Sequence, residues 1–153
     1  MKEALKEAKK AFNKDEVPVG AVIVKDGKVI ARAHNVKEEK NDSTYHAEII
    51  AIRKACKKLG AWRLTECDMY VTLEPCSMCA GALINSRIRT IYIGTMDEKT
   101  GACGSVLNLL EDYKFNHKIE IHKYILKEDC EDILKNFFKL LREKKKNNIN
   151  MDK

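Results

Sequence analysis

Hydrophobic positions near the start of the chain repeat first with a helical period and then with the pattern of strands. In residues 2–12 the apolar side chains recur on one side among lysines and glutamates, which predicts an amphipathic helix. Two β-branched runs, 21–24 and 28–31, then flank Asp26-Gly27, a dipeptide that is typical of a β-hairpin in this setting. The chain is therefore expected to open as helix, strand, strand.

A second helix is predicted from about residue 46 to residue 59. A polar stretch precedes it and offers Asp42, Ser43 or Thr44 as the N-cap, because short polar side chains accept hydrogen bonds from the first backbone N–H groups of a helix. Gly60 follows the last apolar position and is expected to end the helix.

Strands and helices alternate through the rest of the chain. The predicted elements are a strand at 69–73, a helix from Pro75 to about 85, a strand at 90–94, a short helix near 106–110, a strand at 118–126 and a helix from about 128 to 144. This alternation indicates an α/β fold in which helices cover a sheet. The last residues, about 146–153, are polar and are expected to be disordered.

The length of 153 residues fits a single domain spanning 1–153. No apolar stretch approaches the roughly 18 residues of a membrane span, and the first residues lack the apolar core of a signal peptide. We therefore expect a cytoplasmic protein with no membrane partner. Its six cysteines are expected to be reduced thiols or metal ligands, because disulfides are rare in that compartment.

The formal net charge is +6, from 29 basic and 23 acidic side chains, and much of the excess lies near the C-terminus. Lys139, Arg142 and the run 144–146 cluster there. A basic end attracts polyanions such as nucleic acids. A lysine-rich terminal helix can equally be a solvated face, so the charge by itself leaves both interpretations open.

Two short motifs together supply the side chains of a hydrolytic metal site. H-A-E at 46–48 offers an imidazole and a carboxylate, and P-C-S-M-C at 75–79 offers two thiols. A structural zinc ion usually has four protein ligands, whereas a catalytic one has three and keeps a position for water. Here His46, Cys76 and Cys79 make three. H-x-E with P-C-x-x-C is the signature of zinc-dependent nucleobase deaminases.

Spacing gives Glu48 a different task from His46. Side chains two positions apart on a helix point about 200° apart, so Glu48 is a poor ligand and is expected to carry a proton. C-x-x-C can also be a redox pair, His46 a helix-cap residue and Glu48 a solvent-facing one, but the two motifs together favour a metal. The other cysteines lack metal spacing and are expected to be small buried apolar residues: Cys56, Cys67, Cys103 and Cys130.

Motifs spread over nearly the whole chain carry a family resemblance, in order and with matching spacing. They lie at 16–22, 46–48, 62–64, 70–76, 79–82, 97–101 and 115–117. With these segments the chain resembles bacterial tRNA-specific adenosine deaminases. The resemblance implies a three-layer cytidine-deaminase-like fold, with a central mixed five-stranded sheet flanked by helices. It also implies a homodimer that hydrolyses adenosine to inosine at the wobble position of a tRNA anticodon.

The resemblance further implies roles for individual residues. His46, Cys76 and Cys79 would hold one Zn²⁺ per subunit, and Glu48 would shuttle protons. The residues expected to contact the tRNA anticodon stem-loop are Pro18, Asn35 and Leu73 around the flipped base, Asp97 near the loop backbone, and Phe138 and Arg142 at neighbouring nucleotides. For Phe138, a position in the core is an equal alternative.

Two other functions remain compatible with these motifs. A deaminase of a free base or nucleoside, of the guanine or cytosine type, would share the metal motifs but would have less need of the basic end or of 97–101 and 115–117. A non-catalytic, zinc-stabilised RNA-binding module would need no unligated glutamate beside the metal. Ser43 and Tyr45 stand where the family usually has proline and alanine, which leaves the finer substrate preference open.

Overall fold

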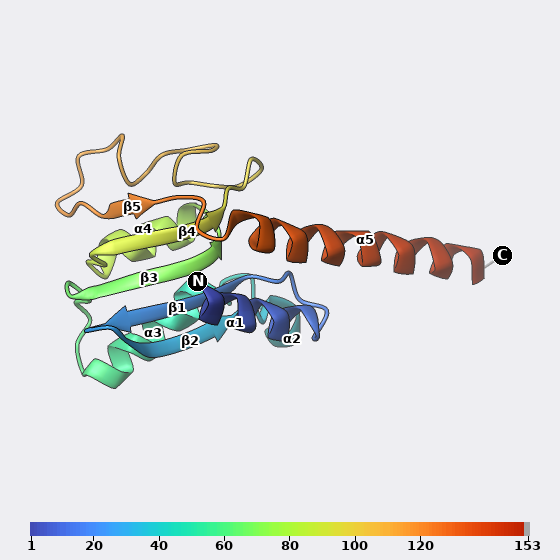
Figure 1. Ribbon diagram of the computed structural model, residues 1–153, viewed down its shortest axis with the longest axis horizontal. Helices are drawn as coiled ribbons and strands as arrows, with labels where there is room; N and C mark the ends of the chain where they lie inside the picture. Colours follow the sequence, from blue (N-terminus) through green and yellow to red (C-terminus); the bar gives the residue numbers. More distant parts are fainter. Residues whose placement is uncertain (152–153) are drawn as a thin grey trace.

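The centre of the molecule is a five-stranded sheet with the order β2-β1-β3-β4-β5 (Figure 1). The computed structural model describes residues 1–151. β1 runs antiparallel to β2 and β3, whereas β3, β4 and β5 are parallel, so the sheet is mixed, as the resemblance implied. The strands are β1 Gly20–Lys25, β2 Lys28–His34, β3 Cys67–Leu73, β4 Thr90–Thr95 and β5 Glu120–His122.

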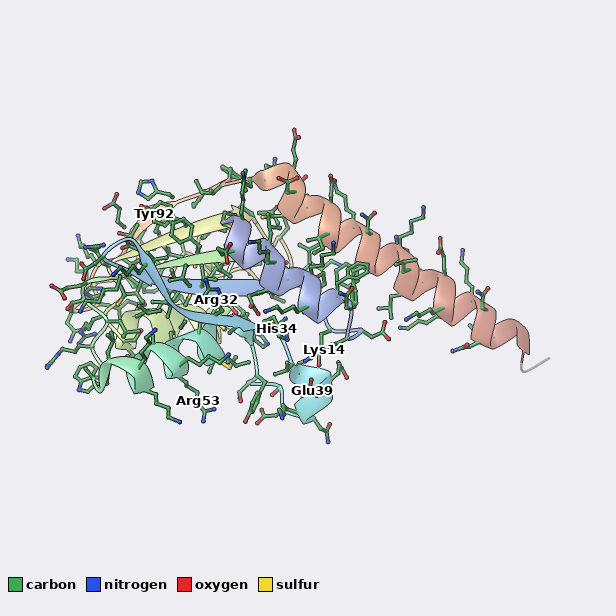
Figure 2. The ribbon with its side chains drawn as sticks, turned by 60° about the horizontal axis from the view of Figure 1, so that its bottom comes forward. Lys14, Arg32, His34, Glu39, Arg53 and Tyr92 are labelled. Carbon is green, nitrogen blue, oxygen red and sulfur yellow. The ribbon has the colours of Figure 1, made fainter. Side chains whose placement is uncertain are left out.

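Helices cover both faces of the sheet and make three layers (Figure 2). α1 and α5 pack on one face, and α3 and α4 lie on the other, while the short α2 follows β2. The helices are α1 Lys2–Phe12, α2 Lys37–Lys40, α3 Ala47–Leu59, α4 Ser77–Asn85 and α5 Lys127–Met151. The expected three-layer α/β fold is confirmed.

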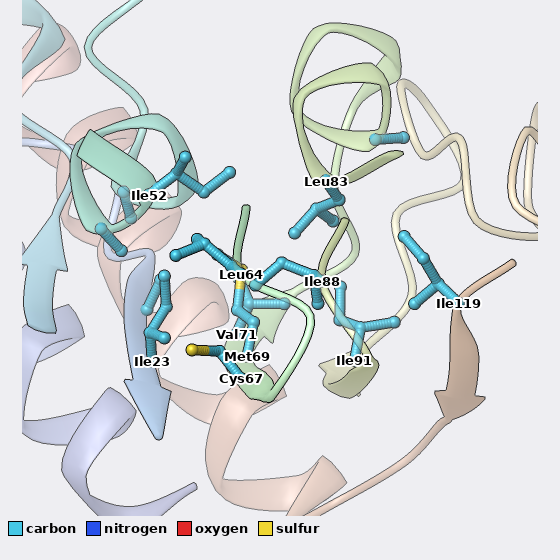
Figure 3. Packing of buried hydrophobic residues seen from close by; sticks show 14 of the residues in the cluster. Ile23, Ile52, Leu64, Cys67, Met69, Val71, Leu83, Ile88, Ile91 and Ile119 are labelled. Carbon is cyan, nitrogen blue, oxygen red and sulfur yellow. The ribbon is translucent and has the colours of Figure 1, made fainter. Parts of the chain in front are cut away.

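The main apolar core lies between the sheet and the pair α3 and α4 (Figure 3). Ile23, Val71 and Ile91 from β1, β3 and β4 are fully buried there. Ile52 from α3 and Leu83 from α4 pack against them. Burial of these side chains stabilises the fold and holds both helices in fixed positions on the sheet.

On the opposite face, α1 lies very close to β1. The side of α1 that meets the sheet carries the fully buried alanines Ala4, Ala8 and Ala11. A Cβ atom at Gly20 of β1 would collide with the backbone of Ala4 and Ala8. Small side chains on the helix and glycine on the strand therefore permit this approach.

Two helix starts differ from the prediction. The N-cap of α3 is His46 and not Asp42, Ser43 or Thr44, because the Asp42 carboxylate instead closes a local turn with the N–H and hydroxyl of Thr44. α4 has Cys76 as its N-cap, so Pro75 precedes the helix instead of lying in its first turn. Gly60 ends α3 in the left-handed conformation, as expected.

The C-terminal third departs further from the prediction. Residues 106–110 do not form a helix: the N–H groups of Val106 and Leu107 both donate to the carbonyl of Gly101, and Asn108 pairs with Cys103 in an isolated bridge. The predicted strand 118–126 is reduced to the three residues of β5.

α5 also continues through 146–151, where disorder was predicted, while residues 152–153 lie outside the described chain. Within the described part, no helix combines the length and apolar character needed to cross a membrane.

Candidate metal centre and adjoining cavity

Two helices begin side by side at one edge of the sheet. β2 and β3 both run antiparallel to β1, so their carboxyl ends lie at the same edge. α3 follows β2 and α4 follows β3, so both helix N-termini return to that edge. His46 and Cys76 are the two N-caps, and Cys79 lies in the first turn of α4.

His46, Cys76 and Cys79 form a compact group of metal-type donors. His46 Nδ1 lies 3.7 Å from Cys76 Sγ and 3.6 Å from Cys79 Sγ. The three donor atoms all lie within 4.8 Å of one another, and the described part of the chain contains no other such group. One imidazole and two thiols are a donor set that suits a tetrahedral ion with one position left open.

Protons are shared unequally within this group. The Cys79 thiol hydrogen-bonds to Cys76 and, together with His46, lowers the pKa of Cys76 to about 4. The same hydrogen bond and burial raise the pKa of Cys79, and the hydrogen bond with Cys76 raises the pKa of His46. A bound cation would replace the protons that this group shares.

Glu48 lies beside this group without being one of its donors. It sits in the first turn of α3 with 3% of its surface exposed, and burial raises its pKa to about 7. Its Oε2 atom has no hydrogen-bond partner among the described residues, although buried carboxylate oxygens normally have one. The carboxyl can thus accept and return a proton near neutral pH, and its free oxygen suits a water molecule or a polar ligand.

A cavity of about 170 Å³ opens next to the donors. His46, Glu48 and Cys76 form one part of its wall. The rest of the lining comes from Glu16, Val17, Val19, Asn35, Lys37, Leu73, Glu74, Asp97 and Thr100. Pro18 was expected here, but it is fully buried and its two neighbours, Val17 and Val19, line the wall instead.

Asn35 connects the cavity to the start of α3. Its Oδ1 atom accepts a hydrogen bond of 2.8 Å from the N–H of Ala47, the residue after His46. This bond satisfies one of the free N–H groups at the helix N-terminus. The amide NH₂ of Asn35 is left as the donor for a ligand.

Asp97 lines the cavity, but its carboxylate is engaged within its own turn. Oδ1 accepts hydrogen bonds from the N–H groups of Lys99 and Thr100, and Oδ2 accepts one from the Thr100 hydroxyl at 2.7 Å. Asp97 therefore shapes the rim of the cavity by holding this turn.

A larger groove of about 670 Å³ adjoins the cavity. Val17, Leu73, Asp97 and Thr100 line both spaces, so the two are continuous. Phe138 on α5 lines the far side of the groove. The groove thus connects the cavity beside the metal-type donors with the last helix, α5.

α5 presents an aromatic and basic surface at the end of this groove. Phe138 is 41% exposed, so it does not take the core position that was the alternative for it. Its neighbour Phe137, which is 6% exposed, is the buried one. Arg142, Lys99 and Lys135 line a further hollow of about 350 Å³ beside Phe138.

Comparison with known proteins identifies the family. The model of the MafB19-like deaminases matches residues 1–142. The tRNA-specific adenosine deaminase of Bacillus subtilis (strain 168) is 52% identical over 146 residues, which are 95% of this chain and 91% of that protein. This chain belongs to the tRNA-specific adenosine deaminase family.

Solved structures place this family member among deaminases. A structure from a study of A-to-I editing by tRNA:A34 deaminases at the wobble position of transfer RNA has a TM-score of 0.85 and 46% identity, and the match covers 88% of this chain and 97% of that one. Guanine deaminase from Bacillus subtilis has a TM-score of 0.61 and 33% identity, covering 93% of this chain and 90% of that one. The likeness to the tRNA deaminase is the stronger of the two.

Sequence reasoning missed several residues of this deaminase's cavity. Glu16, Glu74 and Lys37 line it, although no motif carries them as ligands or catalysts. The signal in the sequence that could have pointed to Glu74 was its position directly before Pro75-Cys76.

The remaining cysteines are all free thiols away from the donor group. Cys67, Cys103 and Cys130 are fully buried, as predicted, and burial raises the pKa of each, in Cys130 to about 11. Cys56 is only half-buried, with its Sγ 3.7 Å from the carbonyl of Trp62. The raised pKa of these four thiols favours their protonated form.

Proposed function

We propose that this protein hydrolyses adenosine to inosine at the wobble position of a tRNA anticodon. One observation carries the proposal: Glu48, nearly fully buried and with one oxygen free of partners among the described residues, lies beside three metal-type donors. A non-catalytic RNA-binding module has no need of such a carboxyl. The substrate follows from the family, whose members are named as tRNA-specific adenosine deaminases.

We infer that His46, Cys76 and Cys79 hold one Zn²⁺ per subunit. The donor set, the lowered pKa of Cys76 and the unpartnered Glu48 oxygen all fit a zinc ion with three protein ligands. When bound, zinc lowers the pKa of its water so that hydroxide is available near neutral pH.

Glu48 moves the protons of the reaction. It accepts one proton from the attacking water as the water oxygen bonds to the ring carbon that bears the amino group. That proton passes to the neighbouring ring nitrogen, and the second proton of the water goes to the amino nitrogen. The carbon–nitrogen bond then breaks, so the products are inosine and ammonia, and Glu48 ends as it began.

The remaining lining residues bind and orient the nucleotide. The free NH₂ of Asn35 donates to the flipped-out nucleotide, and Leu73 packs against the base, with Pro18 supporting the wall from behind. Asp97 holds the rim of the cavity near the anticodon-loop backbone. Bases adjacent to the flipped one follow the groove, where Phe138 offers a stacking surface and Arg142 a charge for phosphate.

Two further properties belong to this proposal. The protein acts as a homodimer, as the family resemblance implies, and exposed Met78, Val106 and Leu107 around the start of α4 offer an apolar contact surface. It acts in the cytoplasm, in keeping with its six free thiols.

The proposal is tested by offering the protein an anticodon stem-loop, free adenosine and free guanine in parallel. We expect ammonia release and inosine from the stem-loop only, and one zinc per chain by metal analysis. Ammonia from free guanine alone would instead identify a free-base deaminase. Purified active protein without zinc would refute the metal assignment.

A further inference from the structure

Glu74 is a nearly buried carboxylate that the proposed reaction does not use. It stands between the end of β3 and Cys76, is 3% exposed and does not belong to the donor group. Taking a carboxylate out of water is unfavourable unless hydrogen bonds compensate for the lost hydration. The hydrogen-bond donors around Glu74 therefore indicate the role of this residue.

Within the described chain, the Glu74 carboxylate accepts its hydrogen bonds from one segment, 97–105. Oε1 accepts from the N–H of Cys103 at 2.9 Å and from that of Ser105 at 3.0 Å. Oε2 accepts from the N–H of Asp97 at 2.7 Å and from the Ser105 hydroxyl. Both oxygens of a single carboxylate thus hold the two ends of the segment.

Segment 97–105 has no helix or strand to support it, yet it lies against the metal-type donors. Its middle pairs with the start of α4 through a bridge between Gly101 and Cys76 and a 2.8 Å hydrogen bond from Ala102 N–H to the Pro75 carbonyl. A Cβ atom at Gly101 would collide with the Glu74 carboxylate, so the two are packed as closely as they can be.

This segment supplies one wall of the cavity. Asp97 and Thr100 line the cavity and also the groove that leads to α5. If this wall moved freely, it would have to become ordered each time a nucleotide binds. The conformational entropy lost in that step would weaken binding.

We propose that Glu74 is a positioning residue that fixes segment 97–105 against the start of α4, so that the nucleotide-binding wall is formed before the substrate arrives. The inference rests on the proposed function for the identity of the substrate. It makes Glu74 the mechanical link between the element that carries Cys76 and the rim of the cavity.

Glu74→Gln is a sharp test because both carboxylate oxygens are acceptors. Whichever way the glutamine amide turns, its NH₂ meets N–H or O–H donors, and one end of the segment is released. We expect zinc content to stay at one per chain and KM for an anticodon stem-loop to rise about ten-fold, with a smaller change in kcat. Amide hydrogen exchange at the released end, which is either Asp97 or the pair Cys103 and Ser105, is expected to accelerate by a similar factor.

Glu111→Gln is the matched control, because Glu111 is exposed and its carboxylate accepts a hydrogen bond from the neighbouring Asn108 side chain. It removes the same charge and is expected to leave KM and exchange unchanged. Gly101→Ala is a second variant: its methyl group would collide with the Glu74 carboxylate and with the Asp97 carbonyl, and it is expected to accelerate amide exchange in the same segment.

The proposal would be overturned if the amides of Asp97, Cys103 and Ser105 exchanged as slowly in both Glu74→Gln and Gly101→Ala as in the wild-type protein. Loss of zinc from folded Glu74→Gln would also overturn it, since Glu74 would then serve the metal donors and not the wall. If the wild-type protein released no ammonia from the stem-loop, the proposed function would fail, whereas the exchange measurement would still decide the role of Glu74.

Discussion

Burial in the first turn of α3 changes the proton affinity of Glu48. An exposed glutamate is fully ionised at neutral pH, but desolvation raises the pKa of Glu48 to about 7. A carboxyl with this pKa suits the proton transfers that we propose for it.

Glu48→Ala is expected to keep both zinc and tRNA binding while lowering the rate of inosine formation by about 10²- to 10⁴-fold, the usual contribution of a general acid–base group. Single-turnover assays with metal analysis would measure this. Exposed Glu128→Ala serves as the control. A fully active Glu48→Ala protein would show that the proton travels another way.

Asn35 has two tasks that two substitutions can separate. Asn35→Asp keeps an oxygen for the Ala47 N–H but loses the amide donor, so substrate affinity should fall by at least about ten-fold at little loss of stability. Asn35→Ala loses both, and should in addition lower the free energy of unfolding by about 1–3 kcal/mol. Stem-loop binding and urea unfolding measure the two effects. Equal stability of the two variants would show that the Ala47 bond contributes nothing.

At the scale of elements, α1 packs closely on β1 only because the side chains at their contact are small. Gly20→Ala would push a methyl group into the backbone of Ala4 and Ala8, and should lower the free energy of unfolding by about 1–3 kcal/mol. Gly81 on α4 has no neighbour at its Cβ position among the described residues, so Gly81→Ala should raise stability by up to about 1 kcal/mol. Denaturant unfolding of both variants tests the contrast, and the opposite order would contradict it.

α1 also carries a buried carboxylate whose ionisation is tied to folding. The Glu7 side chain is 5% exposed and lies 2.6 Å from Lys10 Nζ and 2.8 Å from His34 Nδ1. Burial acts to raise the pKa of Glu7, but the hydrogen bonds with Lys10 and His34 outweigh it and the net pKa is lowered.

Because the folded pKa of Glu7 lies below the unfolded one, the carboxylate stabilises the fold above the unfolded pKa, and this contribution is lost as the pH falls through the folded pKa. Glu7→Gln should therefore lower the free energy of unfolding by about 1–3 kcal/mol at neutral pH, and the difference should shrink below about pH 4. Urea unfolding across this range is the measurement, with exposed Glu38→Gln as the control. A difference independent of pH would exclude ionisation as its cause.

At the scale of the whole molecule, α5 runs past the sheet and projects from the body (Figure 1). The family model matches residues 1–142, and the basic run 144–146 follows it toward the end of α5. Lys144 Nζ lies 2.6 Å from Asp15 Oδ1, and this ion pair ties α5 to the turn that follows α1. Lys145 and Lys146 are exposed and continue the basic surface beyond Arg142.

Reversal of Lys145 and Lys146 to glutamate is expected to weaken tRNA binding and flatten its dependence on salt, by about 0.9 in the log–log slope for each phosphate that is no longer neutralised. Lys144 is spared so that its pair with Asp15 stays intact. The same reversal at exposed Lys57 and Lys58 on α3 is the control for net charge. Identical salt slopes in the two double variants would mean that the tail is only a solvated face.

The chain's local patterns determined the order of its elements and the chemistry of its donors. α1, the hairpin of β1 and β2, and the end of α3 at Gly60 match the predictions, because period and turn chemistry act between near neighbours. The three donors could be named for a similar reason, since each motif is only a few residues long.

Tertiary structure alone decided how the ends of these elements meet. Which residue caps α3 or α4 depends on where the chain leaves the sheet, and His46 and Cys76 come together because β2 and β3 share a direction across β1. Likewise, Phe137 is buried because its ring packs against Phe12 of α1, whereas Phe138 is exposed. The role of Glu74 also follows only from the tertiary structure, because its hydrogen-bond donors in segment 97–105 are distant in the chain and close only in space.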